Sequence, residues 1–199
     1  FAGQIRTRMP VERILRPPGK PVSVGFRNGQ TLEFDEVVIA THSDEALAML
    51  SDPTEDERSV LGALPYRDNE VILHTDTRLL PKIQRAWSSW NYRLKPGSGR
   101  ATVTYNMNIL QGINAPETFC VTLNDTASIN PHRILGRFNY AHPQFTLAGM
   151  KAQQRWGEIN GQNGTWFCGA YWQNGFHEDG LSSGLRVAES LCAARQMAA

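Results

Sequence analysis

The chain has 199 residues, of which 41% are hydrophobic and 20% charged, enough to bury one core or two small ones. Lysine and arginine number 20 against 19 aspartate and glutamate, a balance that argues against a generic nucleic-acid binder and against a disordered acidic tail. No apolar run approaches the roughly 20 residues that span a bilayer. The three cysteines lack metal-ligand spacing and favour a reduced, cytoplasmic protein.

The beginning of the chain predicts a fragment. It has no apolar segment of the kind found in secretory signal peptides. It also lacks an initiator Met, and residues 6–16 already resemble the middle of a domain. We therefore expect the sequence to be part of a longer protein.

Alternation and turn signals in the first 34 residues predict a β-meander. A short strand is expected at residues 10–15, and residues 22–26 alternate apolar with small or polar side chains. Asn28-Gly29 is a strong hairpin signal because both residues accept a positive φ. Leu32 and Phe34 continue the alternation on a third strand.

A buried strand and two helices are expected next. Residues 36–40 form an apolar run typical of a strand buried on both faces. A first helix is expected at residues 44–50, capped by Thr41 or Ser43. Thr54 and Glu57 match a capping box for a second helix. The apolar face of that helix would comprise Val60, Leu61 and Leu64.

The middle of the chain predicts a sheet. Its candidate strands are residues 71–74, 86–92, 101–106, 119–123 and 133–140. In the third of these, Val103 and Tyr105 alternate with Thr102 and Thr104, so the threonine face is expected to be solvated. One helix is expected at residues 147–156.

The end of the chain predicts a strand, a glycine-bearing loop and a helix. Residues 166–170 read as a buried strand and residues 171–180 as the loop. Leu181, Leu185, Ala188 and Leu191 mark one face of the helix. Such a helix N-terminus favours an electron-rich ligand group, although a plain strand-to-helix connection would have the same pattern.

Two segments carry a resemblance to a known family. Gly169, residues 175–184, Ala188 and Leu191 resemble the C-terminal FAD-binding segment of the flavin-containing amine oxidase superfamily. That superfamily includes protoporphyrinogen oxidases, carotenoid desaturase-like proteins and bacterial NAD/FAD-binding oxidoreductases. Residues 30–41 resemble its second cofactor-domain segment, in which a meander leads into a buried strand.

The resemblance implies an α+β fold made of two domains. Residues 1–48 and 160–199 would belong to an incomplete Rossmann-like FAD-binding domain of α/β type that lacks its N-terminal βαβ unit. Residues 49–159 would form a mixed-sheet substrate domain. The chain contains no Gly-x-Gly-x-x-Gly pattern, the turn that holds the pyrophosphate in such folds.

The resemblance also implies which residues lie at the cofactor, while no catalytic residue is assigned and no metal site is expected. The backbone of Val11 would reach the adenine, Phe176 would face the flavin ring, and the amides of His177 and Glu178 would reach the flavin edge. The implied cofactor-binding residues are Val11, Ala40, Thr41, Gly169, Gly175, Phe176, His177, Glu178 and Gly180.

The implied function is that of an FAD-dependent oxidoreductase taking a hydride from a C–H bond of a small organic substrate. Ala170 stands where the family has an acidic residue that Glu178 or Asp179 would have to replace, and residues 71–74 lack the lysine of amine oxidases. The alternative is therefore a ligand- or partner-binding domain without redox chemistry. The fragment alone is expected to hold FAD weakly or not at all. It is also expected to self-associate through apolar surface along residues 37–39 and the Leu185 face.

Other candidates are weighed against plainer interpretations. The five histidines lack metal spacing and are interpreted as surface or hydrogen-bonded residues. Trp87, Trp90 and Tyr92 either pack in a core, the favoured interpretation, or line a pocket. Cys168 is interpreted as a small core residue.

Overall fold

The computed structural model describes residues 2–94 and 102–198, which form two compact units. The first contains Phe1–Tyr66 and Pro143–Ala199, and the second contains Arg67–His142. The chain passes from one unit to the other between residues 66 and 67 and again between residues 142 and 143. The expected domain boundaries are instead at 48/49 and 159/160. The division of those domains into cofactor and substrate functions stays a prediction.

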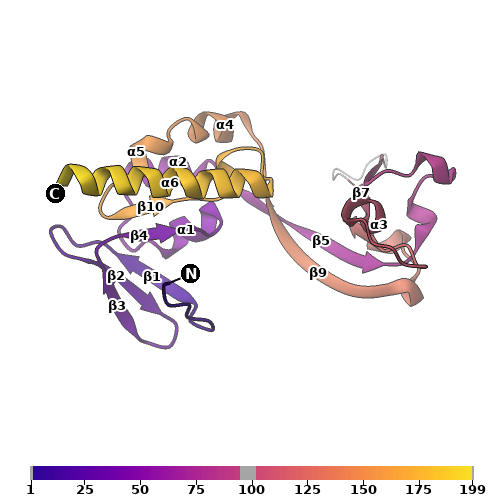
Figure 1. Cartoon of the computed structure of the whole chain (residues 1–199), viewed down its shortest axis with the longest axis horizontal. Helices are drawn as coiled ribbons and strands as arrows, with labels where there is room; N and C mark the ends of the chain where they lie inside the picture. The colour runs from indigo at the N-terminus through magenta and orange to yellow at the C-terminus, as the bar shows by residue number, and fades with distance from the viewer. Residues whose placement is uncertain (1, 95–101, 199) are drawn as a thin grey trace. The chain divides into compact units, whose positions relative to one another are not determined.

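The first unit combines a three-stranded meander, a two-stranded parallel pair and helices that cover the pair (Figure 1). Its elements are β1 (Val11–Leu15), β2 (Val22–Phe26), β3 (Thr31–Phe34), β4 (Val37–Ile39), α1 (Ser43–Met49), α2 (Glu55–Gly62), α4 (Leu147–Gln153), α5 (Trp156–Ile159), β10 (Thr165–Phe167), the 3-10 helix η5 (Ala170–Trp172) and α6 (His177–Ala198).

The predicted meander is confirmed. Strands β1, β2 and β3 pair antiparallel in chain order, and Val22 and Val24 are buried. At the turn between β2 and β3, Gly29 has a φ of +84° and donates its N–H to the carbonyl of Phe26. The positive φ explains the glycine, because other residues adopt it at a cost.

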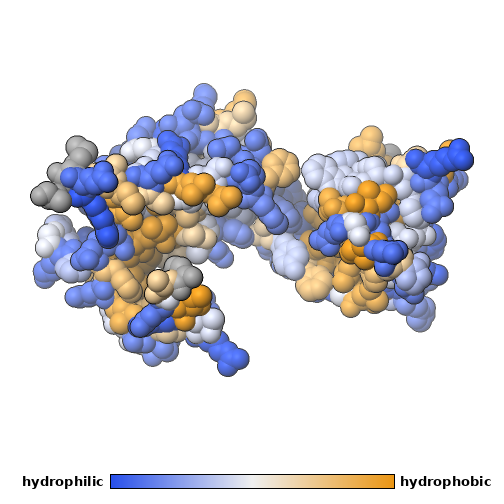
Figure 2. Space-filling model, in the orientation of Figure 1, coloured by the Kyte–Doolittle hydropathy of each residue, from blue (hydrophilic) through white to orange (hydrophobic). Residues whose placement is uncertain are grey.

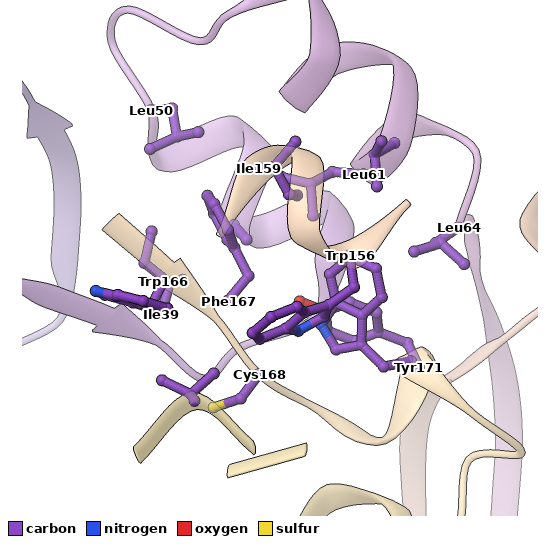
Figure 3. Packing of buried hydrophobic residues seen from close by; sticks show 14 of the residues in the cluster. Ile39, Leu50, Leu61, Leu64, Trp156, Ile159, Trp166, Phe167, Cys168 and Tyr171 are labelled. Atoms are coloured by element: carbon purple, nitrogen blue, oxygen red, sulfur yellow. The ribbon is translucent and has the colours of Figure 1, made fainter. Parts of the chain in front are cut away.

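Strands β4 and β10 pair in parallel although 128 residues separate Val37 from its register partner Thr165. Phe167 and Ile39, also register partners, lie in the main core. Figure 3 shows Phe167 among Ile159, Trp156 and Ile39. The expectation of a strand buried on both faces is wrong for β4, because Val38 is 45% exposed.

One of the two predicted helix caps is present, at α2, and the other, at α1, is not. The Thr54–Glu57 capping box of α2 is confirmed, with Glu57 accepting the Thr54 N–H at 2.8 Å. The expected cap of α1 is wrong, because His42 is the N-cap residue. Ser43 is buried inside the helix, where its hydroxyl donates to the carbonyl of Leu64.

Two helices differ from expectation in extent. The helix expected at residues 147–156 is two helices, α4 and α5, which Gln154 and Arg155 separate. Helix α6 begins at His177, four residues before Leu181, so Gly180 lies in its first turn. Its buried side includes Val187, while Leu181 and Leu185 of the expected apolar face are exposed.

The second unit is a five-stranded sheet in the order β6-β7-β8-β5-β9. Its elements are β5 (Tyr66–His74), η1 (Thr77–Leu79), η2 (Gln84–Ala86), β6 (Trp90–Arg93), β7 (Thr102–Asn106), α3 (Met107–Gln111), β8 (Cys120–Leu123), η3 (Thr126–Ser128), η4 (Pro131–Arg133) and β9 (Ile134–Pro143). The strand expected at residues 86–92 is shorter and begins at Trp90. Ala101, the first residue of another expected strand, lies outside the described residues.

The expected solvation of the threonine face of β7 is wrong. Thr104 is buried, and its hydroxyl lies 2.8 Å from the hydroxyl of Thr122 on the neighbouring strand β8. Thr122 also contacts Nε2 of the buried His74 at 2.7 Å. The three side chains therefore form a buried polar cluster, whose hydrogen bonds offset the cost of removing them from water.

Candidate functional site

The candidate site is at the carboxyl ends of β4 and β10. Cys168, directly after β10, donates its N–H to the carbonyl of Ile39, the last residue of β4. Ala40 and Gly169 follow these two residues and lie at one edge of the parallel pair. In open α/β sheets, ligands bind outside the carboxyl ends of the strands.

A cavity of about 530 Å³ lies between the meander, β4 and α1. Three of the residues assigned to the cofactor by resemblance line it together: Val11, Ala40 and Thr41. The other lining residues are Glu12, Ile14, Val24, Arg27, Val37, Val38, Ile39, Glu45, Ala48 and Met49. Figure 2 shows hydrophobic side chains at the surface of this unit between α6 and the meander.

The cavity has apolar walls and a few charged groups. Val24 and Ile39 belong to its buried wall, while Glu12 and Arg27 supply charges from β1 and the β2–β3 turn. The register of β1 against β2 shifts between Val11 and Arg13, so Glu12 lies at an irregularity of the ladder. Such bulges reorient side chains beside binding sites. Sequence reasoning missed Glu12 and Arg27 because only the strand pairing brings them together.

The loop between β10 and α6 holds the remaining candidate residues. Gly175 has a φ of +86°, and a Cβ there would lie 3.2 Å from the ring of Phe145. The carboxylate of Asp179 accepts the N–H groups of Asn174 and Phe176 at 3.1 and 2.9 Å. Asp179 therefore caps α6 and fixes the loop. Phe176, His177 and Glu178 are left exposed at the start of the helix.

The first two turns of α6 pack directly against the segment after β10. The N–H of Gly169 donates to the hydroxyl of Ser183 at 3.1 Å. A Cβ on Gly180 would meet only Ala170, at 3.9 Å. The structure thus brings Gly169 and Gly180 together, and the β4–β10 pairing connects them to Ala40 and Thr41.

The carboxylate of Asp179 is engaged by hydrogen bonds within the loop. This matters because Asp179 is one of two candidates to replace the acidic residue that the family has at the position of Ala170. Both of the N–H groups that it accepts belong to the loop itself. Glu178 is exposed beside it at the helix start. Of the two acids weighed as replacements, Glu178 is therefore the one available to a ligand.

An aromatic stack borders this edge and was not expected from the sequence. The ring of His42 stacks on Tyr66 with centroids 4.0 Å apart, and Tyr66 meets the edge of Tyr171 at 6.5 Å. Burial and the charges of Asp44 and Glu45 raise the pKa of Tyr66 to about 12. Burial also raises the pKa of Tyr171 above its ordinary value. Both phenols are therefore neutral at physiological pH and can donate hydrogen bonds.

The plainer interpretations hold for some side chains and fail for others. His74 and Cys168 are buried, as expected for a hydrogen-bonded histidine and a core cysteine. Trp90 and Tyr92 are 46% and 70% exposed and line a surface cleft, so the pocket interpretation holds for them.

Within residues 2–94 and 102–198, no three His, Cys, Asp or Glu side chains are grouped as a metal site would require. No helix in this same part of the chain has the length and apolar character to cross a bilayer.

Several solved structures have similar folds, and this chain spans less than half of the length of each. A CLA-producing fatty acid isomerase from P. acnes superposes with a TM-score of 0.60 at 16% identity, over 89% of this chain and 46% of that protein. A protein provisionally assigned as a protoporphyrinogen oxidase, from Exiguobacterium sp. 255-15, gives a TM-score of 0.63 at 14% identity, over 94% and 47%. A redesigned putrescine oxidase gives 0.61 at 10% identity, over 94% and 48%.

These similarities show the fold, and they confirm the expected α+β class as part of a larger protein architecture. No curated protein matches the sequence. The sequence model of one family, described as flavin containing amine oxidoreductase, matches residues 2–192. That match spans nearly the whole chain and includes the meander, the β4–β10 pair and the first four turns of α6. The chain belongs to the flavin-containing amine oxidoreductase family.

Proposed function

We propose that this chain is the C-terminal part of an FAD-dependent oxidoreductase that removes a hydride from a C–H bond of an organic substrate. The observation that carries the proposal is the cavity of about 530 Å³, where Val11, Ala40 and Thr41 meet at the carboxyl end of β4. Membership in a flavin-containing family supports a flavin as the cofactor. When bound, the flavin supplies the two-electron acceptor.

The cavity fits the adenosine end of FAD. Its aliphatic walls, which include Val24 and Val38, suit a flat apolar ring. The register of β1 shifts next to Val11, whose backbone would reach the base edge. Arg27 offers a positive charge and Glu12 an acceptor at the same cavity, which suits phosphate and ribose groups respectively.

The start of α6 fits the flavin end. N–H groups without a partner inside the helix, together with the helix dipole, would stabilise negative charge on a reduced ring. Gly180 leaves space against Ala170, so a ligand can approach the backbone there. Phe176 is exposed at the helix start and would form an aromatic wall beside the ring.

A second candidate is a ligand- or partner-binding domain that uses the same fold without redox chemistry. Two observations favour it: Ala170 replaces the family's acidic residue, and Val71–Leu73 of β5 provide no lysine. The absence of Gly-x-Gly-x-x-Gly from the chain also predicts that this chain alone binds FAD weakly.

The two candidates differ in what the cavity binds. We would titrate AMP and, separately, riboflavin into the chain and follow backbone NMR signals. The proposal expects AMP to shift the signals of Val11, Ala40 and Thr41. Ala40→Trp should abolish that binding, because the exposed Ala40 side chain borders the cavity. Ala188→Trp, at an exposed position of α6 away from the cavity, is the matched control.

In the full-length protein, the test is the flavin absorbance of the purified protein and its bleaching by substrate under anaerobic conditions. A yellow protein whose flavin is reduced by an organic substrate supports the oxidoreductase. A colourless protein whose cavity does not bind AMP would overturn the proposal and leave the binding-domain alternative.

A further inference from the structure

The second unit carries a surface cleft in which every charged lining side chain is cationic. It encloses about 520 Å³ between η1, η2 and β6. The lining residues are Arg78, Leu79, Leu80, Pro81, Lys82, Ala86, Ser88, Trp90, Asn91, Tyr92 and Arg93. Arg78, Lys82 and Arg93 are therefore opposed by no acidic residue in the lining itself.

Two of the three cationic side chains, Arg78 and Arg93, form ion pairs with buried carboxylates that are not part of the cleft lining. The guanidinium of Arg78 donates from Nε and Nη2 to Asp76 at 2.9 and 2.6 Å, and the Asp76 side chain is buried. Arg93 pairs with the equally buried Asp125 at 3.7 Å. The outer surfaces of both guanidinium groups remain exposed. An arginine fixed in this way loses less side-chain entropy when it binds an anion.

The carboxylate behind Arg78 is itself firmly positioned. Hydrogen bonds from Arg78 hold the pKa of Asp76 well below its ordinary value, and the N–H of Asn130, at 2.8 Å, adds to the effect while burial opposes it. Asp76 therefore stays charged throughout the physiological range and continues to accept hydrogen bonds from Arg78.

The cleft is preformed by hydrogen bonds of its own loop. Trp87 donates from Nε1 to the carbonyl of Pro81 at 2.8 Å. Asn91 accepts the N–H of Ser88 and donates to the carbonyls of Ser88 and Thr104. These contacts tie the segment before β6 to the sheet, so the lining needs little ordering when a ligand binds.

Apolar and aromatic side chains form another part of the cleft lining. The side chains of Trp90 and Tyr92 are 46% and 70% exposed although they belong to a strand, and Trp90 makes an edge contact with Tyr105 at 6.2 Å. Exposed aromatic rings beside cations suit a ligand with an apolar body and an anionic end.

We propose that this cleft binds a small monocarboxylate with an aromatic or aliphatic body. With Asp76 and Asp125 behind them, the three cations leave one net positive charge, which matches one carboxylate better than a doubly charged phosphate. Arg78 uses Nε and Nη2 for Asp76, so Nη1 is the nitrogen left to donate to a ligand carboxylate. Lys82 has no ion-pair partner among residues 2–94 and 102–198, so its ammonium group is available. This site does not depend on flavin binding in the other unit.

The test uses 4-phenylbutyrate and its uncharged isostere 4-phenylbutyramide, titrated into the full chain and followed by calorimetry and ligand-observed NMR. We expect the carboxylate to bind at least about tenfold more tightly than the amide, because charge-assisted hydrogen bonds are the stronger ones. Inorganic phosphate should bind more weakly than phenylbutyrate. Equal affinity for acid and amide, or tighter binding of phosphate, would overturn the proposal.

Two variants separate the charged and apolar contributions. Lys82→Gln should weaken phenylbutyrate about three- to fivefold and leave phenylbutyramide unchanged, as expected for one exposed ion pair. Tyr92→Ala should weaken both ligands. Lys151→Gln, on the exposed surface of α4, is the control and should change neither. Because Lys82 and Tyr92 are exposed, both variants should fold. Identical effects of Lys82→Gln and Lys151→Gln would show that binding occurs elsewhere.

Discussion

Arg16 donates from Nη2 to Oε2 of Glu57 at 2.8 Å, and both side chains are only 1% exposed. Asp52 accepts from the backbone N–H and Nε of the same arginine. Burial disfavours the charge of Arg16, but the hydrogen bonds and charges of Glu57 and Asp52 outweigh it and raise the pKa of the guanidinium. Glu57 also accepts the Thr54 N–H, so one carboxylate serves both the cap of α2 and the ion pair that joins it to β1.

We predict that Arg16→Met lowers the free energy of unfolding by about 3–5 kcal/mol, because it leaves a buried carboxylate unpaired. The measurement is urea denaturation followed by circular dichroism. Arg58→Gln, at an exposed position of α2, should change the free energy of unfolding by less than about 0.5 kcal/mol. Similar losses in both variants would mean that the buried pair is not the cause.

His74 should make the second unit less stable in mild acid. Its Nδ1 accepts the Asp76 N–H at 3.0 Å, so in the neutral ring Nε2 carries the proton and donates to Thr122. Burial lowers the pKa of His74, with the charge of Asp76 opposing the shift. The unfolded chain then binds a proton that the folded chain rejects, so stability is lost as pH falls below the unfolded value of about 6.5.

We predict that the free energy of unfolding falls between pH 7.5 and 5.5, by up to about 1.4 kcal/mol per pH unit from this residue. His74→Gln should flatten that dependence even if it costs stability at pH 7.5. His132→Gln, at an exposed position, should preserve the wild-type slope. A slope unaltered by His74→Gln would refute the assignment.

Two glycines should respond oppositely to alanine. Gly175 has a φ of +86° and Phe145 lies 3.2 Å from its ideal Cβ position, so Gly175→Ala should destabilise by about 1–2 kcal/mol. Gly184 is inside α6, and a Cβ there meets nothing within 4 Å among the described residues. Gly184→Ala should therefore stabilise by about 0.5–1 kcal/mol. Thermal melts of both variants check the signs.

In the full-length protein, Gly180→Asp should weaken flavin binding by about 1–3 kcal/mol, while Ser182→Asp should not. Gly180 faces Ala170 at the candidate site, and its new carboxylate would compete for the amides at the start of α6. Both variants add one charge near the same helix end, so their melting temperatures should be similar. Equal flavin affinity in both folded variants would show that this loop does not face the cofactor.

The isolated chain should self-associate through its exposed apolar side chains. Val38, Leu181 and Leu185 are about half exposed on β4 and α6, and contiguous apolar patches mark association surfaces. We predict that Leu181→Gln combined with Leu185→Gln shifts light-scattering masses toward the monomer. Leu147→Gln, at an exposed position on α4, is the control. A clean wild-type monomer at high concentration would contradict the prediction.

The sequence alone determined the features that neighbouring residues control. Alternation and the Asn28-Gly29 turn predicted the meander, and the spacing of Thr54 and Glu57 predicted the cap of α2. The family resemblance, carried by the loop after Gly169, also required only the sequence. These patterns are readable because turn geometry, strand period and helix capping depend on residues a few positions apart.

Tertiary structure decided everything that depends on a distant partner. Thr104 of β7 is buried against Thr122 of β8, which supplies its hydroxyl partner and is itself bonded to His74. Ser43 does not cap α1 because its hydroxyl is taken by Leu64, 21 residues away. The candidate cavity exists because β4, α1 and an irregular β1 enclose it. Amphipathic spacing indicates which side of a helix or strand is apolar, but it does not identify the element that packs against that side. Burial is set by strand pairing and packing between residues far apart in the chain.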